Sequence, residues 1–194
     1  MKTSILIALP ILALLPFAAV AQTQNETVTP TIPETQIEPA PLSSPYEFVS
    51  VATSADMFIV RASELAETRA ASAEVKALAA DLSSAHTRRM EATRAAGQAD
   101  KVEIAAPSVD GEQQGMLGKL EPLEGADFDK SYVEATTFVH QRTIAYYRGF
   151  ADKGGNLGAH ATESLPELIA QYATLTALGG MVGASGAQQP APAQ

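Results

Sequence analysis

The sequence predicts an all-α protein, a four-helix bundle with one short extra helix and a kink at the proline of its last long helix. Hydrophobic residues make up 46% of the 194 residues while aromatic residues make up only 6%, and alanine, the strongest helix former, is frequent. Apolar residues recur at three- and four-residue steps along four long segments. Because each apolar stripe must be covered by another, four amphipathic helices are expected to pack together.

The N-terminal segment, residues 1–21, predicts a cleaved signal peptide. Lys2 precedes an apolar run that is too short for a comfortable membrane span, and Ala19 and Ala21 give the small-x-small pattern that a signal peptidase needs. We therefore expect a periplasmic or secreted protein without a membrane span after cleavage. An uncleaved N-terminal anchor is the alternative. The absence of cysteine excludes disulfides, a lipid-modified cysteine and thiolate chemistry.

Three further segments follow from composition. Residues 22–47 are rich in Pro and Thr and contain no basic residue, which predicts a disordered, solvated linker. Residues 48–179 hold the amphipathic pattern and form the predicted bundle domain. Residues 180–194 return to a Gly-, Pro- and Gln-rich composition, which predicts a disordered tail.

The bounds of the first two helices follow from residues that typically start or end a helix. The first is predicted from about Phe48 to Arg69. Ser72 is a suitable N-cap for the second helix, which should continue to a stop near Gly97.

The later helices have similar signals. Asp110 and Gln113 have capping-box spacing for a short helix, which Gly125 is expected to end. The third long helix should run from about Asp127 to the glycine pair 154–155, and the last over about 157–178. Pro166 should kink that last helix or restart it, because proline removes a backbone donor.

Charge and motif content exclude several activities. Thirteen Lys and Arg residues stand against 22 Asp and Glu residues, a net charge of −9 that repels nucleic acid and anionic lipid. The sequence contains no Gly-x-Ser-x-Gly elbow, no phosphate-binding loop and no dinucleotide fingerprint. Hydrolase, kinase and dehydrogenase functions therefore lack a site, and we expect a protein that is not an enzyme.

His86 and His140 are the candidates for internal chemistry, since both fall on apolar helix faces. We expect each ring to pack in the bundle and to bond to a hydroxyl such as that of Tyr132, with His86 replaceable by Leu without loss of stability. A cluster of His86, His140 and Tyr132 is thus the expected buried polar group. The alternative is an iron or zinc site in which His86 and His140 are joined by Asp81 or Glu134.

Other ionisable residues favour surface roles. No Glu-x-x-His pair of the kind found in di-iron bundles occurs in the sequence. His160 and Glu163 lie near a glycine-rich turn, where we expect exposure. Arg88, Arg89 and Arg142 are expected to pair with surface carboxylates rather than to bind an anion. No metal or cofactor is expected.

Five segments, in order and spacing, resemble the bacterial family called domain of unknown function 4142. The resemblance covers most of residues 48–178 and implies an exported, ferritin-like four-helix bundle of the bacterial envelope with no established activity. The segments are Ser72-Ala-Glu-Val-Lys76, the stretch from Asp81 to Thr87, the stretch from Gly125 to Val133, Val139-His-Gln141 and Leu165-Pro-Glu-Leu168.

Three departures from the family pattern affect the expected function. Family members often have glutamates at the positions of Ile59 and Arg61, and a histidine at that of Gln171. We therefore expect a non-enzymatic exported helical protein with a structural, stress-related or partner-binding role. The alternatives are a divergent ferritin-like metalloprotein or oxidoreductase using His86 and His140, and a binder of small apolar molecules. The sequence identifies no protein partner and leaves the oligomeric state open.

Overall fold

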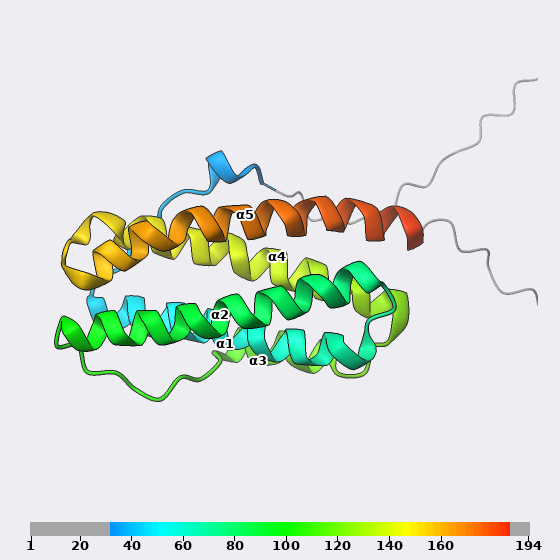
Figure 1. Ribbon diagram of the computed structural model, residues 1–194, viewed down its shortest axis with the longest axis horizontal. Helices are drawn as coiled ribbons and strands as arrows, with labels where there is room; N and C mark the ends of the chain where they lie inside the picture. The colour runs from blue at the N-terminus through cyan, green and yellow to red at the C-terminus, as the bar shows by residue number, and fades with distance from the viewer. Residues whose placement is uncertain (1–31, 187–194) are drawn as a thin grey trace, which may run out of the picture. The chain divides into compact units, whose positions relative to one another are not determined.

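The computed structural model describes residues 32–186 of the chain (Figure 1). This part is built of helices, with no strand, so the all-α prediction is confirmed. No helix within it is long and apolar enough to cross a membrane. The predicted signal peptide lies outside the described residues. The α-helices are α1 (Pro45–Arg69), α2 (Ala73–Ala99), α3 (Gly111–Leu120), α4 (Gly125–Phe150) and α5 (Gly155–Gly186), and the short 3-10 helices are η1 (Glu34–Gln36) and η2 (Ala151–Lys153).

The four long helices enclose one interior. α1 packs against α2 and α4, and α5 packs against α4 and α2 (Figure 1). At one end, the carboxylate of Asp129 near the start of α4 accepts hydrogen bonds from the backbone N–H groups of Ala71 and Ser72 at 3.1 and 2.8 Å. The start of α4 therefore lies beside the turn between α1 and α2.

The opposite end is closed in a similar way. The carboxylate of Asp100, just after α2, accepts from the N–H groups of Asn156 and Leu157 at 3.0 and 2.8 Å. The end of α2 thus lies beside the start of α5, and each long helix runs antiparallel to its two neighbours. Since α2 and α4 then run in the same direction, the connection over residues 100–124, which includes α3, must return along the helices (Figure 1).

The predicted caps are present at two helix starts. The Ser72 hydroxyl accepts from the N–H groups of Glu74 and Val75, and Asp110 and Gln113 form a complete capping box. The predicted role of Gly125 was wrong: α3 ends at Leu120, and Gly125, whose φ is 64°, is the first residue of α4.

The ordered helix extends beyond its predicted end. α5 continues through Pro166 as a single helix, so the alternative of a restart is not observed. It reaches Gly186, whereas the sequence predicts a disordered tail from residue 180. The glycine pair 179–180 resembles a helix stop, but α5 continues through it, which explains the misplaced boundary.

Residues 32–44 also differ from the predicted solvated linker. Ile37 is buried, the Ala40 N–H donates to the Ala145 carbonyl at 2.8 Å, and Arg148 donates to the Ile37 carbonyl at 2.6 Å. This segment therefore packs along the last turns of α4, and the Tyr172 hydroxyl in the middle of α5 donates to the Ile32 carbonyl at 2.7 Å. The composition of this segment did not predict the packing, because composition indicates only how much surface a segment can bury against itself. The contacts are made with α4 and α5, which are distant in the sequence.

The interior contains two apolar clusters. One, around Phe58 and Phe128, lies near the end of α1 and the start of α4. The other, around Phe48 and Tyr147, lies near the start of α1 and the end of α4. Polar residues separate these two halves of the core.

Candidate functional site

A layer of buried polar side chains crosses the interior between the two apolar clusters. Asp56 of α1, His86 of α2 and His140 of α4 have exposed fractions of 0%, and Arg89 of α2 has 4%. We call these four residues the polar layer. Three of the four long helices thus contribute ionisable groups to a region that water does not reach.

Asp56 and Arg89 form an ion pair inside this layer. Arg89 Nη2 and Nε donate to Asp56 Oδ1 at 2.8 and 3.1 Å. The second carboxylate oxygen, Oδ2, is buried and has no hydrogen-bond partner within the described part of the chain. Because burying an isolated ion costs roughly several kcal/mol, each of these charges requires the other.

His86 connects the ion pair to His140. Its Nδ1 lies 2.9 Å from Asp56 Oδ1, and its Nε2 lies 3.0 Å from Nε2 of His140. At the far end, His140 Nδ1 lies 2.9 Å from the carbonyl oxygen of Thr136. The side chains therefore form a linear row, Asp56–His86–His140, in which each imidazole uses both of its nitrogens.

Burial determines which of these groups carry charge. It lowers the pKa of His86 well below 6.5, with the Arg89 charge adding to the effect, and it lowers that of His140 in the same way, with His86 and Arg89 adding. Burial raises the pKa of Asp56 against the opposing charge of Arg89. For Arg89 itself, burial would lower the pKa, but Asp56 and Tyr147 raise it overall. Arg89 is therefore charged at neutral pH, and both histidines are neutral.

A second group of contacts extends from the layer toward the surface. The Thr93 hydroxyl donates to the Arg89 carbonyl at 2.9 Å and lies 3.2 Å from the Tyr147 hydroxyl and 2.9 Å from His160 Nε2. His160 is half-buried, so it is the imidazole nearest to solvent. On the same side, Arg89 Nη1 donates to Gln171 Oε1 at 3.4 Å.

Within residues 32–186, no group of three or more His, Cys, Asp or Glu side chains is placed to hold a metal ion. The two Nε2 atoms that face each other, one from each histidine, thus lack a third side chain of this kind placed with them in these residues. Arg89, moreover, already supplies a positive charge beside Asp56.

The sequence-predicted residues are only partly brought together. His86 and His140, both members of the expected cluster, contact each other through their Nε2 atoms. Tyr132 is buried but lies 2.9 Å from the Ser63 hydroxyl instead. The metal candidates Asp81 and Glu134 are both exposed, so neither joins the histidines.

Two predictions about polar residues near the layer were wrong. His160 was expected to be exposed, yet it is half-buried against Thr93. Arg89 was expected at the surface, yet it is the buried partner of Asp56. Glu163 is exposed as predicted.

Asp56 is the functional residue that the sequence analysis missed. It lies between Ala52 and Ile59 on a buried stripe of α1, where a lone carboxylate requires an internal partner. Arg89 follows His86 by three residues and so lies on the same face of α2. Together these two spacings could have identified the ion pair.

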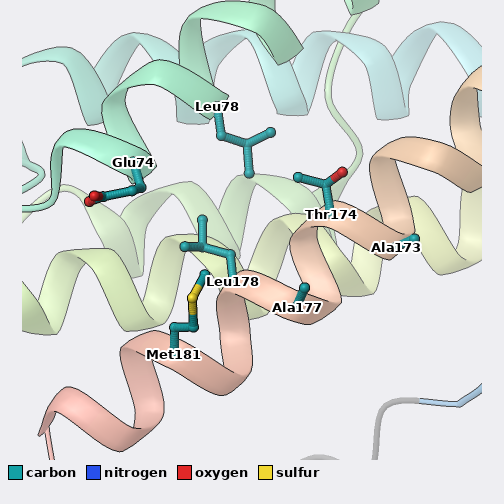
Figure 2. Close-up of a pocket in the computed structure, with 7 residues that line it drawn as sticks. All are labelled: Glu74, Leu78, Ala173, Thr174, Ala177, Leu178 and Met181. Carbon is teal, nitrogen blue, oxygen red and sulfur yellow. The ribbon is translucent and has the colours of Figure 1, made fainter.

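An apolar groove lies apart from the polar layer, between the start of α2 and the later part of α5 (Figure 2). Its volume is about 500 Å³, and none of its lining residues belongs to the polar layer. The lining residues are Glu74, Leu78, Ala173, Thr174, Ala177, Leu178 and Met181.

The fold and the polar layer define an all-α protein with an ion pair sealed inside its helical core. The chain belongs to the family described as Domain of unknown function (DUF4142), whose model matches residues 31–178. No curated protein and no solved structure was found to match the chain.

Proposed function

We propose that the protein is a non-enzymatic, exported helical-bundle protein of the bacterial envelope with a structural, stress-related or partner-binding role. One observation carries this proposal: Asp56, His86 and His140 have no exposed surface and contact one another. A general acid or base must come within hydrogen-bond reach of its substrate, directly or through one water. The interior groups are thus suited to holding helices together rather than to turnover.

The connectivity supports a ferritin-like bundle. Each long helix is antiparallel to its neighbours, and a single long connection, residues 100–124, returns along the helices. One long crossover is typical of ferritin-like four-helix bundles. The polar layer lies where such bundles hold their cofactors, although here an ion pair occupies that level.

Export is tested by sequencing the N-terminus of the protein recovered from a periplasmic or culture fraction. We expect the chain to start at Gln22, after the small-x-small pattern. Recovery in the membrane fraction with an intact segment 1–21 would overturn cleavage and favour the anchor.

The metalloprotein alternative is tested by elemental analysis of protein purified without chelator and then loaded with iron or zinc. The row geometry predicts far less than one ion per chain, with no difference between the wild type and His140→Gln. Stoichiometric metal that His140→Gln removes would overturn the proposal and favour a divergent metalloprotein.

A second candidate function, binding of a small apolar molecule, is supported by the groove between α2 and α5. Its volume of about 500 Å³ is within the usual range of ligand sites, about 300–1,000 Å³. Native mass spectrometry of fresh protein would then show a retained molecule that Ala177→Trp displaces. Ala170→Trp, also exposed on α5 but outside the groove, is the matched control.

A further inference from the structure

The hydrogen positions in the Asp56–His86–His140 row can be deduced from its far end. The carbonyl oxygen of Thr136 only accepts, so His140 Nδ1 must carry a proton. A neutral His140 then has a bare Nε2, which can only accept. The proton between the two Nε2 atoms, 3.0 Å apart, therefore belongs to His86.

This assignment leaves one contact of the row without a proton. A neutral His86 with its proton on Nε2 has a bare Nδ1, and that atom lies 2.9 Å from Asp56 Oδ1. An ionised carboxylate is also only an acceptor. Arg89 Nη2 lies close to both of these atoms and 3.0 Å from His86 Nε2, and it has only two N–H groups to share among them.

We propose that this contact is a binding site for one proton, held between Asp56 Oδ1 and His86 Nδ1. With that proton bound, every contact of the row, from Asp56 to the Thr136 carbonyl, contains one hydrogen. The charge of the layer rises from zero, where Asp56 and Arg89 cancel, to plus one. A fall in the pH of the surroundings thus changes the net charge inside the core.

The unsatisfied oxygen of Asp56 independently supports this assignment. Its Oδ2 is buried and has no hydrogen-bond partner among residues 32–186, whereas both oxygens of Asp129 accept backbone N–H groups. A carboxylate that is incompletely hydrogen-bonded is costly in the interior, and a proton reduces that cost. Burial raises the pKa of Asp56 and lowers that of His86, which brings the proton affinities of the two groups closer together.

The groups around the site introduce no competing internal charge. On α4, burial raises the pKa of Tyr147, which keeps its hydroxyl neutral. On α5, burial lowers the pKa of His160, and Gln171 is uncharged. Glu167 of α5, whose charge contributes to raising the pKa of Arg89, is exposed, and its carboxylate lies 3.8 Å from Arg88. Asp56 and Arg89 are thus the charges that the added proton unbalances.

Binding of the proton has a structural consequence. It offsets the negative charge of Asp56 of α1, which otherwise balances Arg89 of α2, and it leaves the layer with one buried positive charge that has no counter-ion. Such a charge disfavours the closed packing of α1 against α2. Acidification is therefore expected to loosen this helix pair in the folded protein.

Nitrogen-15 NMR of the histidine rings in the full chain tests the site between pH 8 and pH 4. At the high end we expect His140 to be protonated on Nδ1 and His86 on Nε2. On acidification, His86 Nδ1 should gain a proton in one step while the His140 ring stays neutral. The side-chain carboxyl carbon of Asp56 should shift with the same midpoint.

Two matched variants separate this site from ordinary titration. Asp56→Asn places an amide donor opposite His86 Nδ1 and gives the layer the charge of its proton-bound state, so the His86 step should disappear. Asp81→Asn removes an exposed carboxylate of α2 and should leave the step in place.

The proposal would be overturned by no change at His86 Nδ1 down to the pH of unfolding, by simultaneous charging of both rings, or by a step that persists in Asp56→Asn. If Asp56→Asn does not fold, the titrations of the His86 ring, the His140 ring and the Asp56 carboxyl in the wild type still test the proposal. Different midpoints for the Asp56 carboxyl and the His86 ring would contradict a shared proton.

Discussion

The His86 imidazole illustrates how a single buried ring can depend on both of its nitrogens. Nδ1 lies beside Asp56 and Nε2 beside His140, and the ring is completely buried. A leucine fills similar space but offers no polar atom to either neighbour. We therefore no longer expect that leucine can replace His86 without loss of stability.

We predict that His86→Leu destabilises the protein by about 1–3 kcal/mol, the usual cost of leaving a buried polar group unpaired. Chemical denaturation monitored by circular dichroism measures this free energy. His160→Leu is the control. That half-buried ring makes fewer polar contacts than His86, so its replacement should lower the free energy of unfolding by less. A stability of His86→Leu equal to that of the wild type would restore the interpretation of a replaceable ring.

At the scale of single elements, the segment before α1 depends on a glycine of α4. A Cβ added at Gly149 would lie 1.9 Å from the carbonyl oxygen of Ala40. The neighbouring Ala40 N–H donates to the Ala145 carbonyl at 2.8 Å. The close approach of this segment to α4 thus requires a residue without a side chain.

Gly149→Ala is expected to push residues 32–44 away from α4 and to destabilise the fold by about 1–3 kcal/mol, the typical cost of overpacking. Hydrogen exchange of the Ala40 amide should become faster. Gly118→Ala in α3 is the matched control, since its added Cβ meets no atom within 4 Å and alanine favours a helix interior by about 1 kcal/mol. Equal exchange at Ala40 in both variants would indicate that this segment is as detached as its composition suggests.

Local signals explain which elements could be predicted. The cap at Ser72 and the capping box at Asp110 depend on residues two or three positions away, and both were found. The packing of residues 32–44 depends on Arg148 and Ala145, more than 100 residues away in the sequence, and was missed. The same distinction applies to the site. Helical spacing places His86 on a buried face, but only the packing of α1 against α2 shows that Asp56 opposes it.

At the scale of the whole molecule, the neutral histidines make stability depend on pH. Burial lowers the pKa values of His86 and His140 in the folded protein. Below a pH of about 6.5 the two histidines therefore bind protons in the unfolded chain but stay neutral in the folded one. Their contribution is complete above that pH and is lost as the pH falls below it. Asp56, whose pKa burial raises, acts in the opposite direction and offsets at most one of these two protons.

We therefore predict that the free energy of unfolding decreases between pH 7 and pH 5. The slope should approach about 1.4 kcal/mol per pH unit for each histidine that stays neutral without compensation. Thermal unfolding at fixed ionic strength gives the measurement. The double variant His86→Gln, His140→Gln should show a much flatter profile over this range, and a wild-type profile that rises toward pH 5 would contradict the sign.

The mutual dependence of Asp56 and Arg89 stabilises the polar layer, and a double-mutant cycle measures this dependence. Asp56→Leu and Arg89→Met should each cost about 3–5 kcal/mol, because each leaves one buried charge alone. The double variant leaves none, so it should be no less stable than either single variant. Costs that simply add, within about 0.5 kcal/mol, would show that the two charges act independently and would contradict the sealed polar layer.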